Sequence, residues 1–184
     1  MDRQPLTFLV ATRNPHKLEE IAAVLGDGFA LEAYESGVEE TGETFEENAL
    51  LKARAVVAAM GRPALADDSG IEVDALGGAP GIHSARWVEE GEWLPELLRR
   101  LDDVPTARRW CRYVCAAAAV WPDGREVVVR GTVEGTVARA PRGSGGFGYD
   151  PIMIPAEGDG RTFAEMPPAD KHALSHRGRA FRLI

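Results

Sequence analysis

Long apolar runs are missing from this sequence. No segment approaches the roughly 20 apolar residues that a membrane-spanning helix needs, and no apolar stretch of the signal-peptide kind stands near the N-terminus. We therefore expect a soluble protein of the cytoplasm with no membrane partner.

Blocks of like charge are also missing. The net charge is −8, and acidic and basic residues are interspersed along the chain. Nucleic acids and anionic membranes attract proteins with a basic face, so this composition predicts no nucleic-acid partner. A small anionic ligand is still compatible with it, because a local cationic pocket can form in an acidic protein.

Cysteine is scarce. The two cysteines, Cys111 and Cys115, stand four positions apart in an apolar segment. In an extended segment this spacing leaves the two residues too far apart for a disulfide. We expect two buried free thiols in a reducing compartment.

Internal repeats, low-complexity tracts and obvious linkers are absent from the sequence. The 184 residues are 45% hydrophobic, which is ample material for a core. Their number suits a single domain over residues 1–184, with two lobes.

Strand and helix patterns alternate in the first half of the chain. Residues 6–11 are an apolar run that predicts a strand, and residues 29–34 are the second predicted strand. Residues 15–25 repeat apolar side chains at helical spacing, with Asn14 as the N-cap and Gly26 as the stop signal. This alternation is typical of an α/β core.

A second helix is predicted after Thr44, because Glu47 three positions later completes the pattern of a capping box. Residues 109–120 and 126–139 then predict antiparallel strands around a turn. The last helix is expected to run from Pro168 to the end of the chain. The middle third thus adds a β-rich lobe to the α/β core.

The most unusual stretch joins the apolar residues 65–66 to Asp67 and Asp68. It predicts a buried strand that ends by delivering carboxylates to the sheet edge, where α/β proteins bind ligands. Neighbours on a strand point to opposite faces, so we expect one aspartate to face the site and the other to face away. Residues 69–70 are expected to turn the chain before a short strand at 71–74.

Two loops have the chemistry to hold an anion and a base. Residues 12–17 join the first strand to a helix N-terminus, where backbone N–H groups and the helix dipole favour a phosphate. Lys17 in that first turn opposes the dipole, so it indicates a bound anion or else a solvated surface lysine. Residues 143–148 contain four glycines, and Phe147 and Tyr149 beside them could stack on a base. No Walker sequence follows the glycines, and a flexible turn is the alternative.

The remaining candidates are cationic or acidic. Lys52 and Lys171 could neutralise phosphates, although a lysine beside an apolar stripe also reaches water easily. His172 and His176 have a spacing seen in zinc sites, but no third ligand accompanies them. Lysines, carboxylates and glycine loops together suit a polyphosphate bound with Mg²⁺, which prefers oxygen ligands. An aspartate can deprotonate the attacking water, so the residues alone predict a Mg²⁺-dependent nucleotide hydrolase.

Taken in order, these motifs resemble those of the inosine triphosphate pyrophosphatase family, the noncanonical purine nucleoside triphosphate pyrophosphatases. Any one motif is weak, but the ordered set is specific and spans nearly the whole chain. The matching segments are residues 12–17, 40–42, 44–49, 52–53, 66–70, 77–81, 84–86, 145–151 and 175–178. Two small departures are Arg13, where glycine is common in the family, and a short C-terminal helix.

The resemblance implies hydrolysis of ITP, dITP and XTP to the monophosphate and pyrophosphate, with Mg²⁺ as cofactor and a purine nucleoside triphosphate as substrate. It also implies an elongated, mixed-sheet α/β fold with a second, β-rich lobe and a cleft between the lobes. Members of the family are usually homodimers, so the resemblance implies a homodimer here.

Carried over residue by residue, the resemblance makes Asp68 both the proton acceptor that activates water and a metal ligand. Glu40 is the second metal carboxylate, with Glu39 and Asp67 as open alternatives. Ser69 is a further substrate contact. The residues assigned to the phosphates are Thr12, Arg13, Asn14, Pro15, His16, Lys17 and Lys52. The residues assigned to the sugar and base are Phe147, Gly148, Tyr149, Asp150, Lys171, His176 and Arg177.

Two other functions compete with this interpretation. The first is a pyrophosphatase of the related Maf type, which acts on pyrimidine or modified nucleotides. The second is a nucleotide-sensing module that binds its ligand without turnover. A substrate panel separates the first from our interpretation, and a test for turnover separates the second.

Overall fold

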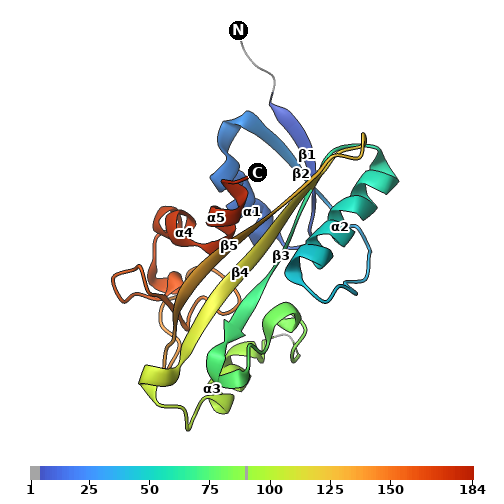
Figure 1. Ribbon diagram of the computed structural model, residues 1–184. Helices are drawn as coiled ribbons and strands as arrows, with labels where there is room; N and C mark the ends of the chain where they lie inside the picture. Colours follow the sequence, from blue (N-terminus) through green and yellow to red (C-terminus); the bar gives the residue numbers. More distant parts are fainter. Residues whose placement is uncertain (1–4, 90) are drawn as a thin grey trace. The chain divides into compact units, whose positions relative to one another are not determined.

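The computed structural model describes residues 5–89 and 91–184. The chain forms a mixed six-stranded sheet with helices, in the strand order β2-β1-β3-β4-β5-β6 (Figure 1). The strands are β1 (Leu6–Ala11), β2 (Phe29–Tyr34), β3 (Ala64–Val73), β4 (Trp110–Val120), β5 (Glu126–Val137) and β6 (Met153–Pro155). The α-helices are α1 (Pro15–Leu25), α2 (Phe45–Met60), α3 (Trp93–Arg100), α4 (Pro168–Leu174) and α5 (His176–Phe181). The α/β fold class predicted from the sequence is confirmed.

The described residues divide into two compact units. Unit 1 contains the described residues up to Asp68, together with Cys115–Gly131 and Arg177–Ile184. Unit 2 contains Ser69–Val114 and Thr132–His176. The chain passes from one unit to the other within β3, β4 and β5, and again after the first residue of α5. The single two-lobed domain with a cleft between its lobes stays a prediction.

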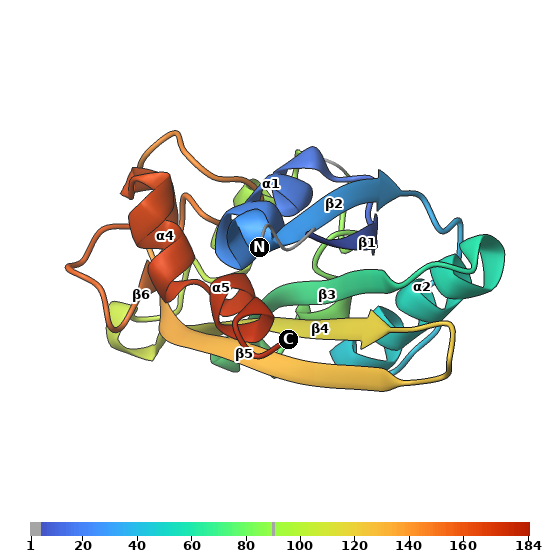
Figure 2. The same ribbon diagram turned by 90° about the horizontal axis from the view of Figure 1, so that it is seen from above.

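Unit 1 is built on β1, which pairs in parallel with β2 and β3. Figure 2 shows β1 and β2 side by side, and their register pairs Leu6 with Phe29. The helix after β1 begins as predicted: the Asn14 side chain accepts hydrogen bonds from two backbone N–H groups of α1, and Gly26 ends the helix. Local sequence therefore determines where this strand–helix–strand segment begins and ends.

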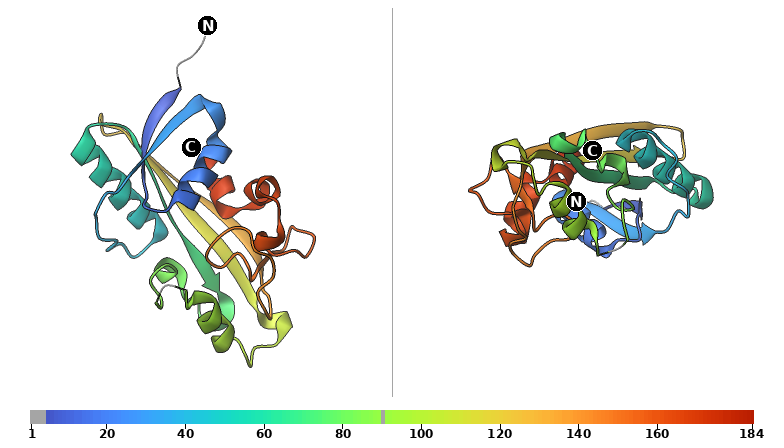
Figure 3. Two further views of the ribbon diagram at one scale, coloured as in Figure 1. Left: turned by 180° about the vertical axis from the view of Figure 1, so that it is seen from behind. Right: turned by 90° about the horizontal axis from the view of Figure 1, so that it is seen from below.

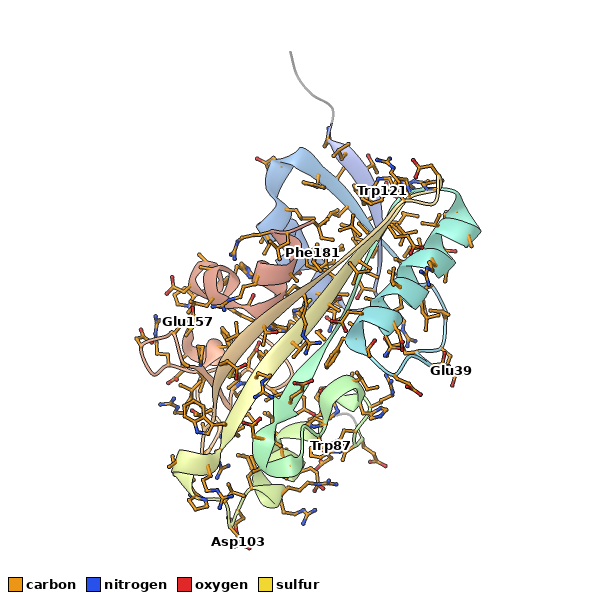
Figure 4. All side chains as sticks on the ribbon, viewed as in Figure 1. Glu39, Trp87, Asp103, Trp121, Glu157 and Phe181 are labelled. Carbon is orange, nitrogen blue, oxygen red and sulfur yellow. The ribbon has the colours of Figure 1, made fainter. Side chains whose placement is uncertain are left out.

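The three helices of unit 1 cover both faces of its strands. Helices α1 and α5 lie on one side of the strands and α2 on the other, and the views from front and behind agree (Figures 1 and 3). On the α1 and α5 side, an apolar cluster joins Leu65 and Cys115 to Ile21 and Phe181. Phe181 and Trp121 of this cluster are labelled in Figure 4.

Helix α2 begins with part of the predicted capping box. The Thr44 hydroxyl accepts a hydrogen bond from the Glu47 N–H at 3.1 Å. The Glu47 carboxylate accepts from the N–H of Glu43 at 2.7 Å rather than from that of Thr44. At the other end Gly61 takes the left-handed conformation that commonly ends helices.

Unit 2 packs around its own apolar cluster, in which the rings of Tyr113 and Phe163 stack at 5.7 Å between centroids. Trp87, labelled in Figure 4, packs against this cluster. Both cysteines are buried free thiols, as predicted: Cys111 belongs to unit 2 and Cys115 to unit 1. Burial raises the pKa of each to about 12.

Two predictions about element boundaries were wrong. Residues 69–70 do not turn the chain, because they lie within β3, a single strand of ten residues. The N–H of Ile71 donates to the Ser84 hydroxyl at 2.9 Å, and Glu72 forms a bridge with Pro80, so this half of the strand has partners of its own. Ser and Gly disfavour strands locally, but tertiary pairing outweighs that preference.

The last helix is not continuous either. It is divided into α4 and α5 by Ser175, whose backbone is extended and whose side chain is buried. His172 and His176 therefore lie on different helices. None of the helices within the described part of the chain is long and apolar enough to span a membrane.

Candidate active site

Asp67 and Asp68 lie in the middle of β3, not at its end as predicted. Their side chains point to opposite faces, as strand geometry predicted. Asp67 contacts Lys17 of α1 and Arg177 of α5, whereas Asp68 contacts residues of α2. Asp67 is 1% exposed and Asp68 is 5% exposed, so the hydrogen-bond and charge partners of both carboxylates come from the protein.

On the α2 side, Asp68 and Glu40 share one cation. The Lys52 ammonium lies 2.7 Å from Oε1 of Glu40 and 3.6 Å from Oδ1 of Asp68. The other oxygen of Asp68, Oδ2, accepts a hydrogen bond from the Asn48 amide at 3.1 Å. Asn48 and Lys52 stand four residues apart on α2, and this spacing places both on the face toward Asp68.

The electrostatics of this cluster follow from burial and from that shared charge. Burial raises the pKa of Asp68 above its ordinary value, and Glu40 raises it further, while Lys52 opposes both. Burial alone would lower the pKa of Lys52, but the surrounding carboxylates together raise it. Asp68 is thus a buried carboxylate that holds a proton more readily than an ordinary aspartate.

Glu40 and Asp68 are the carboxylates on this face that could hold a divalent ion together with substrate phosphates. Within residues 5–89 and 91–184, no group of three or more His, Cys, Asp or Glu side chains could hold a metal. Mg²⁺, however, is commonly bound by one or two carboxylates together with waters and substrate phosphates. Glu40 and Asp68 both lie beside the Lys52 ammonium, so these are the two carboxylates that could contribute to such a site. Glu39, labelled in Figure 4, is exposed on the same loop.

On the opposite face, Asp67 is surrounded by cations. Its carboxylate lies 3.1 Å from the Lys17 ammonium and 3.0 Å from Nη2 of Arg177. The Arg177 side chain is 2% exposed and also pairs with Glu20. Although burial alone would raise the pKa of Asp67, Lys17 and Arg177 hold that pKa well below its usual range.

The ion pair with Asp67 explains how Lys17 can lie in the first turn of α1, where the helix dipole disfavours a cation. Its side chain is 19% exposed, so it is not the solvated surface lysine of the alternative interpretation. The negative charge that offsets the helix dipole is supplied by Asp67. Glu20, the partner of Arg177, was missed by sequence reasoning, because its partner lies 157 positions away.

The predicted phosphate loop forms the turn from β1 into α1. The Thr12 hydroxyl accepts from the N–H of Asn14 at 3.0 Å, and the Asn14 side chain accepts from His16 and Lys17. Arg13 is exposed and pairs with Glu35 at 3.2 Å. Pro15 and His16 are exposed as well.

In unit 2, the glycine loop is held by Asp150. Oδ2 of Asp150 accepts from the Lys171 ammonium at 2.5 Å and from the Phe147 N–H at 2.8 Å, while Oδ1 accepts from the Tyr113 hydroxyl at 3.2 Å. A Cβ on Gly146 would lie 2.1 Å from Oδ2 of Asp150, so only glycine fits there. The loop therefore has a specific anchor.

The same loop places an aromatic ring beside a cation. The Lys171 ammonium lies 4.7 Å from the centroid of the half-buried Phe147 ring, within cation–π range. The His176 ring lies 4.6 Å from that of Tyr113. Tyr149 is buried, and its hydroxyl donates to the backbone of unit 2. Tyr113 itself had no sequence signal, since the sequence shows it only as part of an apolar strand.

The predicted residues thus form separate groups. In unit 1, Lys17 and Arg177 surround Asp67, and Glu40 and Lys52 surround Asp68. In unit 2, the residues brought together are Phe147, Gly148, Asp150, Lys171 and His176, and Ser69 lies half-buried on β3.

Known proteins match this chain over nearly its whole length. The model of the Ham1 family matches residues 8–184. A dITP/XTP pyrophosphatase of Symbiobacterium thermophilum is 53% identical, with 94% of this chain and 90% of the relative covered. A solved HAM1 protein of Coxiella burnetii matches with a TM-score of 0.84 and 36% identity, covering 97% of this chain and 95% of that one.

A solved dITP/XTP pyrophosphatase of Mycobacterium abscessus has a TM-score of 0.75 and is 48% identical, with 96% of this chain and 97% of that one covered. Identity at this level over almost the full length of each chain goes far beyond a shared fold. The family resemblance predicted from the sequence is confirmed, and the chain belongs to the Ham1 family.

Proposed function

We propose that this protein hydrolyses noncanonical purine nucleoside triphosphates, namely ITP, dITP and XTP, to the monophosphate and pyrophosphate. The observation that carries the proposal is Asp68, a buried carboxylate of raised pKa that shares the Lys52 cation with Glu40. A carboxylate in such a position can take a proton from water. The names of the dITP/XTP pyrophosphatase relatives support the substrate class.

In this mechanism Asp68 accepts the proton of the water that attacks the α-phosphorus, and pyrophosphate leaves. Glu40 and Asp68 would hold Mg²⁺, which neutralises phosphate charge when bound. Lys52 and the segment from Thr12 to Lys17 contribute further positive charge and backbone donors around the triphosphate.

The base preference has a physical basis. A 6-keto purine offers a hydrogen-bond acceptor where adenine offers a donor. In this proposal backbone donors pair with the keto group and are left unpaired by adenine, at a cost of about 1–3 kcal/mol for a buried group; the Arg177 guanidinium itself is held by Asp67 and Glu20. In the same proposal Phe147 stacks on the base and Lys171 contacts it. Guanine has the same keto group, so its rejection depends on its 2-amino group.

The decisive assay incubates the protein with ITP and Mg²⁺ and measures pyrophosphate and orthophosphate separately. We expect pyrophosphate as the direct product, and we expect EDTA to abolish its release. Orthophosphate as the direct product would mean attack at the γ-phosphate and would contradict the mechanism.

A substrate panel of ITP, XTP, GTP, dTTP and UTP tests the substrate class. We expect ITP and XTP to be preferred, whereas a clear preference for dTTP or UTP would favour a Maf-type enzyme. Nucleotide binding without Mg²⁺-dependent release of pyrophosphate would favour a sensing module.

We further propose that the protein acts in the cytoplasm as a homodimer, as the family resemblance implies. Light scattering coupled to size-exclusion chromatography tests the dimer. A mass near that of the 19.9 kDa chain itself would contradict it.

A further inference from the structure

We propose that Asn48 is a positioning residue that ties the Asp68 carboxylate to the loop carrying Glu40. The proposal rests on the proposed function, because it assigns Asn48 a part in orienting the proton acceptor and the metal carboxylate. No role followed for Asn48 from its place in the sequence.

Both ends of the Asn48 amide are used. The side chain is 0% exposed and lies on α2, one turn before Lys52. Its Nδ2 donates to Oδ2 of Asp68 at 3.1 Å, and its Oδ1 accepts from the N–H of Gly42 at 2.8 Å. The amide group is planar, so fixing one end orients the other. The second oxygen of Asp68 is thereby left toward the Lys52 ammonium.

The loop is held so closely against α2 that any side chain at position 42 would displace it. A Cβ on Gly42 would lie 2.7 Å from Oδ1 of Asn48 and 2.7 Å from Cβ of Glu47. The backbone N–H of the next residue, Glu43, donates to the carboxylate of Glu47 on α2 at 2.7 Å. Glu40 lies two residues before this anchored point, so the place of its carboxylate beside Lys52 depends on the contact between Gly42 and Asn48.

The chemistry of the position requires asparagine. Asp68 needs a donor and the Gly42 N–H needs an acceptor, and the Asn side chain supplies both at the required reach. Aspartate keeps the acceptor but replaces the donor with a carboxylate oxygen that repels Asp68, and leucine keeps the approximate size but loses both. Each substitution therefore removes a defined part of the link.

A purely structural role is the alternative, because any buried polar side chain with satisfied hydrogen bonds stabilises its surroundings. A stability effect and a positioning effect differ in kinetics. Loss of stability lowers the melting temperature and leaves the catalytic constants of the folded enzyme intact. Loss of orientation lowers kcat, while KM for the nucleotide changes little.

The kinetic test compares Asn48→Asp and Gly42→Ala with the control Val56→Ala. Val56 is buried on α2 two turns beyond Asn48, so its truncation weakens packing of the same helix away from Asp68. We expect Asn48→Asp to lower kcat about 10–100-fold, the range seen when groups that orient ligands are removed. Gly42→Ala displaces the loop, and we expect it to raise the Mg²⁺ concentration needed for half-maximal activity. Val56→Ala is expected to lower the melting temperature and to keep kcat.

A second measurement is independent of activity. Hydrogen exchange of the Gly42 amide is expected to be slow in the wild type and in Asn48→Asp, and at least tenfold faster in Asn48→Leu. Equal exchange in all three proteins, wild-type kcat in Asn48→Asp, or an equal loss of kcat in Val56→Ala would each overturn the proposal. If the wild type releases no pyrophosphate from any nucleotide, the proposed function fails, and the exchange data alone then decide whether Asn48 holds the loop.

Discussion

The two faces of β3 at its midpoint carry neighbouring aspartates in opposite electrostatic settings. Asp67 meets two cations, Lys17 and Arg177, and its pKa falls. Asp68 shares the single Lys52 cation with Glu40, and its pKa rises. Burial is nearly the same for both, so burial alone does not determine what a carboxylate does. Burial raises the pKa of both carboxylates; Lys17 and Arg177 outweigh it at Asp67, whereas Lys52 does not outweigh it at Asp68.

The difference separates a structural carboxylate from a reactive one. A buried ion pair with complete partners is costly to break and has no proton to exchange near neutral pH. A general base works best when its pKa approaches the working pH, and burial shifts the pKa of Asp68 in that direction in the metal-free protein. The face with fewer cations is therefore the face that we assign to catalysis.

The largest expected effect comes from Asp68→Asn. Asparagine keeps the size of the side chain but cannot accept the proton of the attacking water. We expect the rate of pyrophosphate release from ITP to fall by about 10²–10⁴-fold, while nucleotide binding measured by calorimetry largely survives. Loss of binding together with turnover would show that Asp68 serves substrate binding rather than proton transfer.

Asp67→Asn tests the other face, where we expect an effect on stability. Removing the negative charge leaves Lys17 and Arg177 without their shared carboxylate, and breaking such a buried pair typically costs about 3–5 kcal/mol. Urea unfolding at neutral pH measures the loss. A variant as stable as the wild type would mean that the ion pairs around Asp67 contribute nothing to folding.

The same variant should change how stability depends on pH. The pKa of Asp67 is lowered in the folded protein relative to its ordinary value of 3.8. Its stabilising contribution is therefore complete above that value and is lost as the pH falls below it toward the folded pKa. We expect the wild type to lose stability more steeply than Asp67→Asn below about pH 4. Parallel pH profiles of the two proteins would contradict the lowered pKa.

Tyr113→Phe extends the comparison to a third buried carboxylate, Asp150 of unit 2. The substitution removes the hydroxyl that donates to Asp150 and keeps the ring that stacks on Phe163. A hydrogen bond to a charged group contributes about 1.5–3 kcal/mol, and Lys171 and the Phe147 N–H still hold the carboxylate. We expect KM for ITP to rise several-fold with kcat nearly unchanged. A fall in kcat at constant KM would contradict an effect confined to binding.

The smallest effect is expected at an exposed ion pair. Arg54 of α2 forms two hydrogen bonds to Glu126 at the surface of unit 1. Exposed pairs of this kind contribute at most about 1 kcal/mol because water and salt screen them. Arg54→Ala should therefore leave activity unchanged and shift urea unfolding only slightly. A loss as large as that of Asp67→Asn would remove the distinction between buried and exposed pairs.

Local signals were sufficient for the first elements of the fold. Asn14, Pro15 and Gly26 fix the limits of α1, and apolar runs fix β1 and β2, because capping and periodicity act between near neighbours. The stretch around Asp67 and Asp68 misled sequence reasoning. Its residues disfavour strands, but the chain stays extended through them, because β3 lies beside β4 in the sheet and Ile71 and Glu72 have partners of their own.

Partners distant in sequence could not be found in this way. Asp67 and Arg177 lie 110 positions apart, Tyr113 and Asp150 lie 37 apart, and no local pattern links them. The motif resemblance identified most of the charged residues but not their partners. The assigned roles of the site residues stay predictions, and the opposite orientation of the two aspartates is confirmed.

The central claim is that a water molecule activated by Asp68 attacks the α-phosphorus. Hydrolysis of ITP in ¹⁸O-labelled water, followed by mass spectrometry of both products, tests it most directly. The mechanism predicts one ¹⁸O atom in the nucleoside monophosphate and none in the pyrophosphate. Label in the pyrophosphate, with an unlabelled monophosphate, would place the attack on the β-phosphorus and contradict the mechanism.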